Sequence, residues 1–349
     1  MQADQIRQTK GDNVKTIFKL ALAIALVLSF TNVNAAEKLN GAGATFPYPV
    51  YSAWAFDYNK VTGVQLNYQS IGSGGGVRQV TERTVDFGAS DDPMKPDQLQ
   101  KNKLIQFPAV IGGVVPVANL QSAKPGELKL DQDLLCKIFL GEIKFWDDEK
   151  IKKMNQGLKL PHGEITVVYR SDGSGTTAIF TNYLASTCLT WKEKVGAGKA
   201  VKFPVGIGGK GNEGVANYVK RTPNAIGYVE FAYAKQNKLD YIQLKNAAGN
   251  FITPSFESFE DAAETGDFDA KKNFYLWLTN APGKNSWPIA GATFILLAKE
   301  KTVSNRNVVK FFDWAFKNGN NKAKDLIYVP LPKGLKDKVR AYWKANGLQ

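Results

Sequence analysis

Histidine and cysteine are scarce in this chain of 349 residues, which contains one histidine and two cysteines. A structural zinc site takes four ligands that are mostly cysteine or histidine, so the composition argues against one. Any histidine-dependent catalytic triad would have to use His162. Because His162 follows Pro161 in an expected loop, we predict that it lies at the surface. The scarcity therefore disfavours zinc-dependent and histidine-dependent enzymes.

Two common enzyme motifs are also missing. A phosphate-binding loop of the form GxxxxGK followed by Ser or Thr is absent, because Gly209-Lys210 lacks both the earlier glycine and the following hydroxyl residue. The G-x-S-x-G turn of many hydrolases is absent too, because Ser73 and Ser174 each lack a glycine two positions earlier. The sequence thus gives no support to a nucleotide-binding loop of this type or to a hydrolase nucleophile.

No apolar run reaches the roughly 20 residues that a transmembrane helix needs. The most apolar stretch, residues 20–30, follows a basic segment and precedes small residues at Val33 and Ala35. Its basic residues are Arg7, Lys10, Lys15 and Lys19. This order is typical of a secretory signal, so we predict that residues 1–35 are a signal peptide removed on export. The mature chain is expected not to be embedded in a membrane.

Export affects how the two cysteines are interpreted. Cys136 and Cys188 would enter an oxidising compartment, where a disulfide can persist. The sequence gives no distance between them, and a disulfide needs a specific geometry. Two alternatives stay open, a Cys136–Cys188 bridge and two buried thiols on separate helices.

The remaining composition is that of a globular protein, with 44% hydrophobic and 22% charged residues. Short β-rich runs alternate with amphipathic helical patterns. The expected strands cover 64–68, 110–118, 165–169, 227–231 and 293–298, and helical patterns cover 77–85, 178–184 and 307–316. This alternation predicts an α/β fold with a largely parallel sheet. The net charge of +13 favours an anionic partner without identifying it.

Three glycine-rich and hydroxyl-rich loops precede expected helices. They are residues 41–47, residues 70–76 and residues 170–177. A helix start offers free N–H groups and the positive end of the helix dipole, which suit an anion. Thr45 is a good helix cap before Pro47, and Arg170 can form a planar fork to a tetrahedral oxyanion that Asp172 could hold in place. Each loop alone is also a common helix-capping turn.

At these loops the chain resembles the periplasmic phosphate-binding proteins of bacterial phosphate ABC importers. The resemblance runs from about Leu39 to about Trp343 and rests on segments in the family's order: 41–47, 72–76, 85–91, 170–176, 208–212 and 225–229. It implies that phosphate is bound by Thr45, Phe46, Ser73, Asp91, Arg170, Ser174, Gly175 and Thr176, with Asp172 supporting Arg170. Without the resemblance, a role for Asp91 as a helix cap or turn residue is as well supported as a role in ligand binding.

The resemblance also implies a two-lobed periplasmic-binding-protein fold of type II character, in which two crossing strands join the lobes and the ligand lies in the cleft between them. Placing the crossings near Val114 and Pro288 gives one lobe of residues 36–113 plus 289–349 and a second lobe of residues 114–288. A ligand that touches both lobes would favour a closed form.

Asp91 suggests how such a site would select its ligand. An ionised carboxylate only accepts hydrogen bonds, and phosphate near neutral pH still carries a P–OH that can donate one. Sulfate carries none, so an ionised Asp91 would reject it.

The resemblance implies a non-enzymatic receptor that binds inorganic phosphate in the periplasm. It would deliver phosphate to the inner-membrane permease of an ABC importer with its ATPase, acting as a monomer without cofactor, metal or nucleic acid. The alternatives are a receptor for another oxyanion such as sulfate, a secreted phosphatase, and an adhesion or matrix protein that binds phosphate incidentally.

Overall fold

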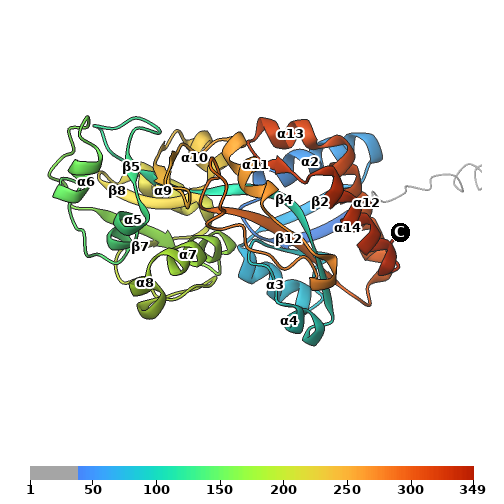
Figure 1. Ribbon diagram of the computed structural model, residues 1–349. Helices are drawn as coiled ribbons and strands as arrows, with labels where there is room; N and C mark the ends of the chain where they lie inside the picture. Colours follow the sequence, from blue (N-terminus) through green and yellow to red (C-terminus); the bar gives the residue numbers. More distant parts are fainter. Residues whose placement is uncertain (1–37) are drawn as a thin grey trace, which may run out of the picture. The chain divides into compact units, whose positions relative to one another are not determined.

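The computed structural model describes residues 38–349, so the predicted signal peptide lies outside the described residues (Figure 1). The strands are β1 Lys38–Gly43, β2 Gln65–Ser70, β3 Phe87–Ser90, β4 Leu104–Ala118, β5 Lys129–Leu130, β6 Thr166–Arg170, β7 Ile207–Gly209, β8 Ala225–Glu230, β9 Asp240–Tyr241, β10 Gln243–Lys245, β11 Phe251–Ile252, β12 Ala290–Ala298 and β13 Val329–Pro330.

Helices separate most of these strands. They are α2 Tyr48–Thr62, α3 Ser73–Thr81, α4 Pro96–Lys101, α5 Gln132–Phe139, α6 Glu149–Met154, α7 Gly175–Thr187, α8 Leu189–Lys194, α9 Gly211–Arg221, α10 Phe231–Asn237, α11 Phe256–Glu264, the 3-10 helix η2 Ala270–Lys272, α12 Thr302–Asn318, α13 Asn320–Asp325 and α14 Lys333–Ala345. The expected α/β class is confirmed.

The main sheet is mixed, which corrects the expected largely parallel sheet. Its order is β2-β1-β3-β12-β4-β8-β6-β7, with β13 and β9 also pairing with β4. The outer pairs β1–β2, β1–β3, β6–β7 and β6–β8 are parallel. The central β12 is antiparallel to β3 and β4, and β8 is antiparallel to β4. Parallel units therefore lie on either side of an antiparallel centre.

Strand β4 runs through both halves of the sheet. Its residues from Leu104 to Gly113 pair with β12, and its residues from Val114 to Ala118 pair with β8. All fifteen of its residues are buried, as a strand with elements on both faces requires. Figure 1 shows β4 and β12 near the middle, with α5 to α9 around one half and α2, α3, α4, α12 and α14 around the other.

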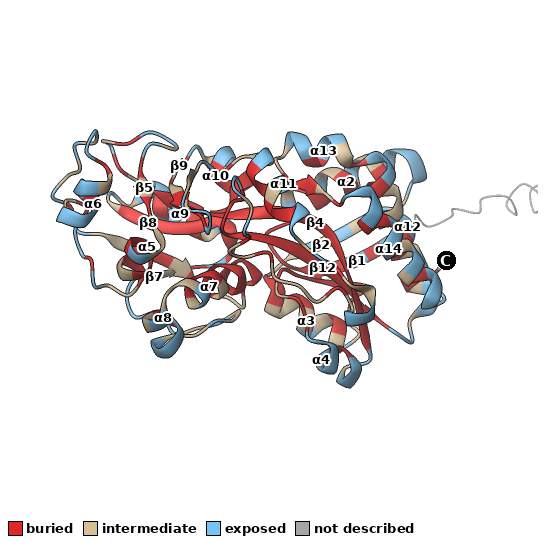
Figure 2. Ribbon diagram, viewed as in Figure 1, coloured by how far each residue is buried: buried red, intermediate tan, exposed pale blue. Residues whose placement is uncertain are grey.

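An aromatic cluster fills the core of the half that contains α12. Phe312 contacts the rings of Tyr51, Phe87 and Phe107 at 5.6–5.8 Å between centroids. Burial of one such side chain stabilises a fold by about 1.5–3 kcal/mol. The same side of α12 buries Val308, Val309 and Phe316. Figure 2 shows the buried strands between partly exposed helices. This packing anchors β1 and β3, whose ends carry two of the predicted ligand segments.

Cys136 and Cys188 form a disulfide, so the structure decides between the two alternatives that the sequence left open. The bridge joins α5 to the end of α7 across a sequence separation of 52 residues. Closing a loop of this length stabilises a fold by about 4 kcal/mol in the chain-entropy account. The helix that begins beside the predicted ligand segment 170–176 is thereby tied down at its far end.

Some local predictions were wrong at their edges. Val85 lies beyond α3, and Phe231 begins α10 rather than ending β8. Lys336, in α14, is 7% exposed. Its Nζ donates to the Phe316 carbonyl near the end of α12 and to Asn320 Oδ1 at the start of α13. Burial lowers the pKa of Lys336 to about 8.

Candidate functional site

Helix α7 begins at the candidate site with an ordinary capping arrangement. The Oγ atom of Ser174 accepts a hydrogen bond from the Thr177 N–H at 3.0 Å, as expected of an N-cap serine. The N–H groups of Gly175 and Thr176 have no hydrogen-bond acceptor among the described residues. Ser174 and Thr176 are fully buried. The first turn of α7 thus presents unpaired donors and the positive end of the helix dipole to an enclosed space.

Arg170 is the last residue of β6, residues 171–174 connect it to α7, and its side chain is 1% exposed. Its Nε and Nη2 atoms donate to the two carboxylate oxygens of Asp172 at 2.7 and 2.6 Å. Burial would raise the pKa of Asp172, but the Arg170 guanidinium holds it below its ordinary value. The Arg170 Nη1 atom is buried without a hydrogen-bond partner. Asp172 therefore fixes the guanidinium and leaves one nitrogen for another acceptor.

Asp91 follows β3 and is 1% exposed. Its Oδ1 atom accepts a hydrogen bond from Thr293 Oγ1 on β12 at 2.7 Å, and its Oδ2 atom is buried without a partner. Burial raises the pKa of Asp91 to about 7, although the Thr293 hydrogen bond and the Arg170 charge act in the opposite direction. The site thus contains a buried donor on Arg170 and a buried acceptor on Asp91, each lacking a partner.

Thr45 does not cap a helix, which corrects the local prediction. The N-cap of α2 is Pro47, and no side chain caps that helix. The Thr45 hydroxyl instead lies 2.7 Å from Asn212 Nδ2 in α9, and the same nitrogen donates to Thr176 Oγ1 at 3.1 Å. Asn212 lies in the segment 208–212 that carries the resemblance, but it is not among the predicted site residues. It joins two predicted site residues that are far apart in sequence.

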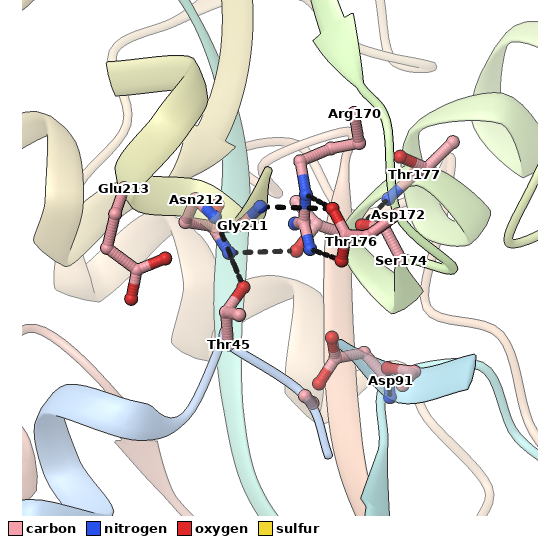
Figure 3. Close-up of polar contacts among 12 residues, drawn as sticks. Thr45, Asp91, Arg170, Asp172, Ser174, Thr176, Thr177, Gly211, Asn212 and Glu213 are labelled. Atoms are coloured by element: carbon pink, nitrogen blue, oxygen red, sulfur yellow. Dashed lines mark hydrogen bonds and ion pairs between the residues drawn. The ribbon is translucent and has the colours of Figure 1, made fainter. Parts of the chain in front are cut away.

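The predicted segments from the two halves of the chain meet at this place. The Gly74 N–H donates to the Gly173 carbonyl at 2.7 Å, and Lys199 pairs with Asp92. A Cβ atom on Gly175 would clash with Ser73 Oγ and Asp91 Oδ2. Figure 3 shows Asp91 and Thr45 approaching from N-terminal segments while the Arg170–Thr177 segment and Asn212 approach from the other half.

The predicted ligand residues are therefore brought together, and they are almost fully buried. Each of Thr45, Phe46, Ser73, Asp91, Arg170, Ser174 and Thr176 is at most 5% exposed. The main-chain N–H groups of Thr45 and Phe46 have no acceptor among the described residues. Such a set of donors with one carboxylate acceptor can hold an oxyanion that still carries a proton.

Glu230 is a second buried carboxyl beside the site, and sequence reasoning missed it. It is fully buried at the end of β8, where its Oε2 atom accepts from the Ala232 N–H and lies 2.8 Å from the Tyr328 hydroxyl. Burial raises the pKa of Glu230 well above its ordinary value, and the Asp91 charge raises it further. No ion pair to Glu230 exists among residues 38–349. The raised pKa favours the neutral carboxylic acid form of Glu230.

Glu230→Gln is therefore expected to be tolerated, and increasingly so as the pH rises. A carboxyl with a raised folded-state pKa loses stability as the pH rises from its ordinary pKa through the raised one. Relative to the variant, the wild-type free energy of unfolding should fall by about 1.4 kcal/mol per pH unit in that window. Denaturant unfolding at several pH values measures the difference. Glu264→Gln, at an exposed position of α11, is the control, and parallel pH profiles for all three proteins would contradict a neutral Glu230.

Other kinds of site receive no support from the described part of the chain. Among residues 38–349, no three or more His, Cys, Asp or Glu side chains are grouped to hold a metal ion. In the same residues no helix is long and apolar enough to cross a membrane. His162 stacks on Phe145 with its side chain 75% exposed, which confirms the predicted surface position.

Comparisons with known proteins place this geometry in a family context. The model of the PBP superfamily domain matches residues 30–318. A phosphate-binding protein PstS of Pasteurella multocida is 53% identical over 331 residues, covering 94% of this chain and 96% of the relative. A phosphate-binding protein PstS of Haemophilus influenzae is 54% identical over 313 residues, covering 89% of this chain and 94% of the relative.

Solved structures share the fold at lower sequence identity. A high affinity periplasmic phosphate-binding protein (PfluDING), solved with bound phosphate, superimposes with a TM-score of 0.68 at 21% identity, covering 87% of this chain and 93% of that structure. A phosphate-binding protein of Stenotrophomonas maltophilia gives a TM-score of 0.67 at 20% identity, covering 88% and 94%. These likenesses show the two-lobed α/β fold.

Proposed function

Because the chain belongs to the family of phosphate-binding proteins PstS within the PBP superfamily, we propose that it binds inorganic phosphate in the buried site between its two halves and delivers it to the permease of an ABC importer. Two unpaired groups carry this proposal. Arg170 Nη1 is a buried donor without an acceptor, and Asp91 Oδ2 is a buried acceptor without a donor. Hydrogen phosphate satisfies both, because it is an anion that retains a P–OH group.

Each predicted residue has a role in this proposal. Arg170 supplies the charged contact and Asp172 fixes its orientation. The N–H groups of Thr45, Phe46, Gly175 and Thr176 donate to phosphate oxygens. The hydroxyls of Thr45, Ser73 and Thr176 line the site, and Ser174 caps α7 so that its first N–H groups are directed there. Ionised Asp91 accepts the P–OH.

We propose the sequence-based boundaries for the two lobes, residues 36–113 plus 289–349 and residues 114–288. The change of β4 from pairing with β12 to pairing with β8 at Val114 supports them. A site this deeply buried requires the lobes to separate for entry and release. The contacts Gly74–Gly173 and Lys199–Asp92 would then break on opening and re-form around bound phosphate.

The cellular setting is part of the same proposal. Residues 1–35 would direct the chain to the periplasm, where it acts as a monomeric, non-enzymatic receptor for a membrane permease and its ATPase. The disulfide between Cys136 and Cys188 is consistent with that oxidising compartment. No cofactor takes part in binding.

Calorimetric titration of the mature protein, stripped of bound anion, tests the proposal. We expect tight one-to-one binding of phosphate and no response to sulfate. Binding of sulfate as well would leave a general oxyanion receptor, and silence to both anions would overturn the proposal. Release of phosphate from a phosphomonoester, with or without divalent metal, would indicate a phosphatase. Unchanged phosphate uptake in a deletion strain would favour an adhesion or matrix role over transport.

A further inference from the structure

Three consecutive main-chain carbonyls beside the candidate site each accept a hydrogen bond from a tyrosine hydroxyl. The pairs are Tyr68 with Ala44 at 2.7 Å, Tyr233 with Thr45 at 2.6 Å, and Tyr328 with Phe46 at 2.7 Å. The tyrosines come from β2, from α10 and from the residue before β13. Three distant segments thus hold one short loop.

Peptide geometry determines where the N–H groups of this loop point relative to the tyrosines. In a trans peptide the C=O of one residue and the N–H of the next point to opposite sides, and the described residues contain no cis peptide bond. A hydroxyl that holds the Ala44 carbonyl therefore directs the Thr45 N–H away from Tyr68. A hydroxyl that holds the Thr45 carbonyl directs the Phe46 N–H away from Tyr233.

The third carbonyl has a different consequence. Phe46 precedes Pro47, which has no N–H to direct. The Tyr328 hydroxyl donates a hydrogen bond to the Phe46 carbonyl, so this partially negative oxygen is not left without a donor. All three carbonyls of the loop are thus satisfied by tyrosine hydroxyls, while the Thr45 and Phe46 N–H groups have no acceptor among the described residues.

We propose that Tyr68, Tyr233 and Tyr328 form a carbonyl clamp that positions the Thr45 and Phe46 N–H groups for the bound oxyanion. The inference rests on the proposed phosphate site, because it assigns those two N–H groups to phosphate. The N–H groups themselves have no acceptor among the described residues. The clamp residues are positioning residues, since they act through the loop.

The clamp requires each hydroxyl to keep its hydrogen. Burial raises the pKa of all three tyrosines well above their ordinary value, so they remain donors near neutral pH. Tyr233 also lies 3.1 Å from Glu213 Oε1, but its contact with the Thr45 carbonyl is shorter.

Tyr328 has one hydrogen and two oxygen neighbours, the Phe46 carbonyl and Glu230 Oε2. If Glu230 is a neutral acid, it donates its own proton to the Tyr328 oxygen. Tyr328 can then donate to Phe46, and both short contacts contain a hydrogen. The charged groups that influence this cluster are Asp91, Glu213 and Arg170.

Single Tyr→Phe variants test the clamp, because each removes one hydroxyl and keeps the ring. Tyr68→Phe, Tyr233→Phe and Tyr328→Phe are each expected to weaken phosphate binding about three- to tenfold, the effect of one lost hydrogen bond. Tyr51→Phe is the matched control. Tyr51 is fully buried in the same region, and its hydroxyl has no partner, so its removal should leave phosphate affinity unchanged.

Amide NMR shifts distinguish positioning from general loosening of the fold. On adding phosphate, the Thr45 amide proton should respond less in Tyr68→Phe, and the Phe46 amide proton should respond less in Tyr233→Phe. Equal affinities for all four variants, or equal changes at both amides in every variant, would overturn the clamp. If the wild-type protein does not bind phosphate at all, it is the proposed phosphate function that is overturned. If one variant does not fold, the other two and their specific amides still decide the outcome.

Discussion

Arg170→Ala is expected to weaken phosphate binding by about 3–5 kcal/mol, which corresponds to roughly two to three and a half orders of magnitude in Kd. The Arg170 side chain is 1% exposed, and two of its nitrogens are committed to Asp172. Its third nitrogen, Nη1, is buried without a partner and is the charged donor proposed for phosphate. Removing it would leave a buried anion without its main cation. Calorimetric titration measures the loss directly.

Two further variants separate charge from geometry. Arg170→Lys keeps the positive charge but loses the planar fork, so we expect affinity between those of the wild type and Arg170→Ala. Arg221→Ala removes an exposed arginine at the end of α9 and should leave affinity unchanged. Because Arg170→Ala also removes the partner of Asp172, its unfolding free energy must be measured alongside. Wild-type affinity in a folded Arg170→Ala protein would contradict the proposed role of Arg170.

The elements of the fold could largely be predicted from the sequence, but strand direction could not. Apolar runs located β4 and β12, which are buried along their whole length as strands covered on both faces are. A run of this kind looks the same whether its neighbour is parallel or antiparallel. The chain returns to the sheet as β12 more than a hundred residues after β4. That long path sets the direction of β12, and the local sequence does not encode it. The expected largely parallel sheet was therefore wrong at the centre.

In the candidate site too, some residues could be predicted from the local sequence, whereas the roles of others depend on distant segments. The segments around Ser73 and Arg170 are recognisable because glycine and hydroxyl residues before a helix have a local cause. Thr45 carries the local signature of a cap, yet its hydroxyl contacts Asn212, 167 residues away. Tyr233 and Glu230 belong to no motif that signals a site, and their relevance comes only from the segments folded against them.

Asp91→Asn is expected to allow sulfate to compete with phosphate. Thr293 orients the Asp91 carboxylate through Oδ1 and leaves Oδ2 buried without a partner. An ionised carboxylate there repels a fully deprotonated anion and offers it no hydrogen, while the P–OH of phosphate can donate to it. Polar sites of this kind discriminate by about 10⁴–10⁵-fold, and we expect the variant to lose at least about 100-fold of this preference. Competition titrations with both anions measure the change.

The pH dependence of sulfate binding provides an independent test of the role of the Asp91 charge. Burial raises the pKa of Asp91 to about 7, and the neighbouring Asp92 adds to the effect. Below this pH the wild-type carboxyl is protonated, so it can donate a hydrogen bond to sulfate and no longer repels it. Direct binding of sulfate to the phosphate-free wild type should tighten between about pH 8 and pH 6, whereas direct sulfate binding to Asp91→Asn should show little change. Sulfate remains a dianion over this range, so the change in its binding reports on the protein alone.

Stability provides the control for this variant. A carboxyl with a raised folded-state pKa loses stability as the pH rises through about 7. The ligand-free Asp91→Asn protein should therefore be at least as stable as the wild type above that pH, and its loss of selectivity would not reflect unfolding. If sulfate stays excluded from the variant at every pH, the exclusion comes from the shape of the site and its N–H donors, and the Asp91 charge is not the selector. If sulfate enters the variant and enters the wild type only in acid, one proton on one buried carboxyl separates two oxyanions of the same shape.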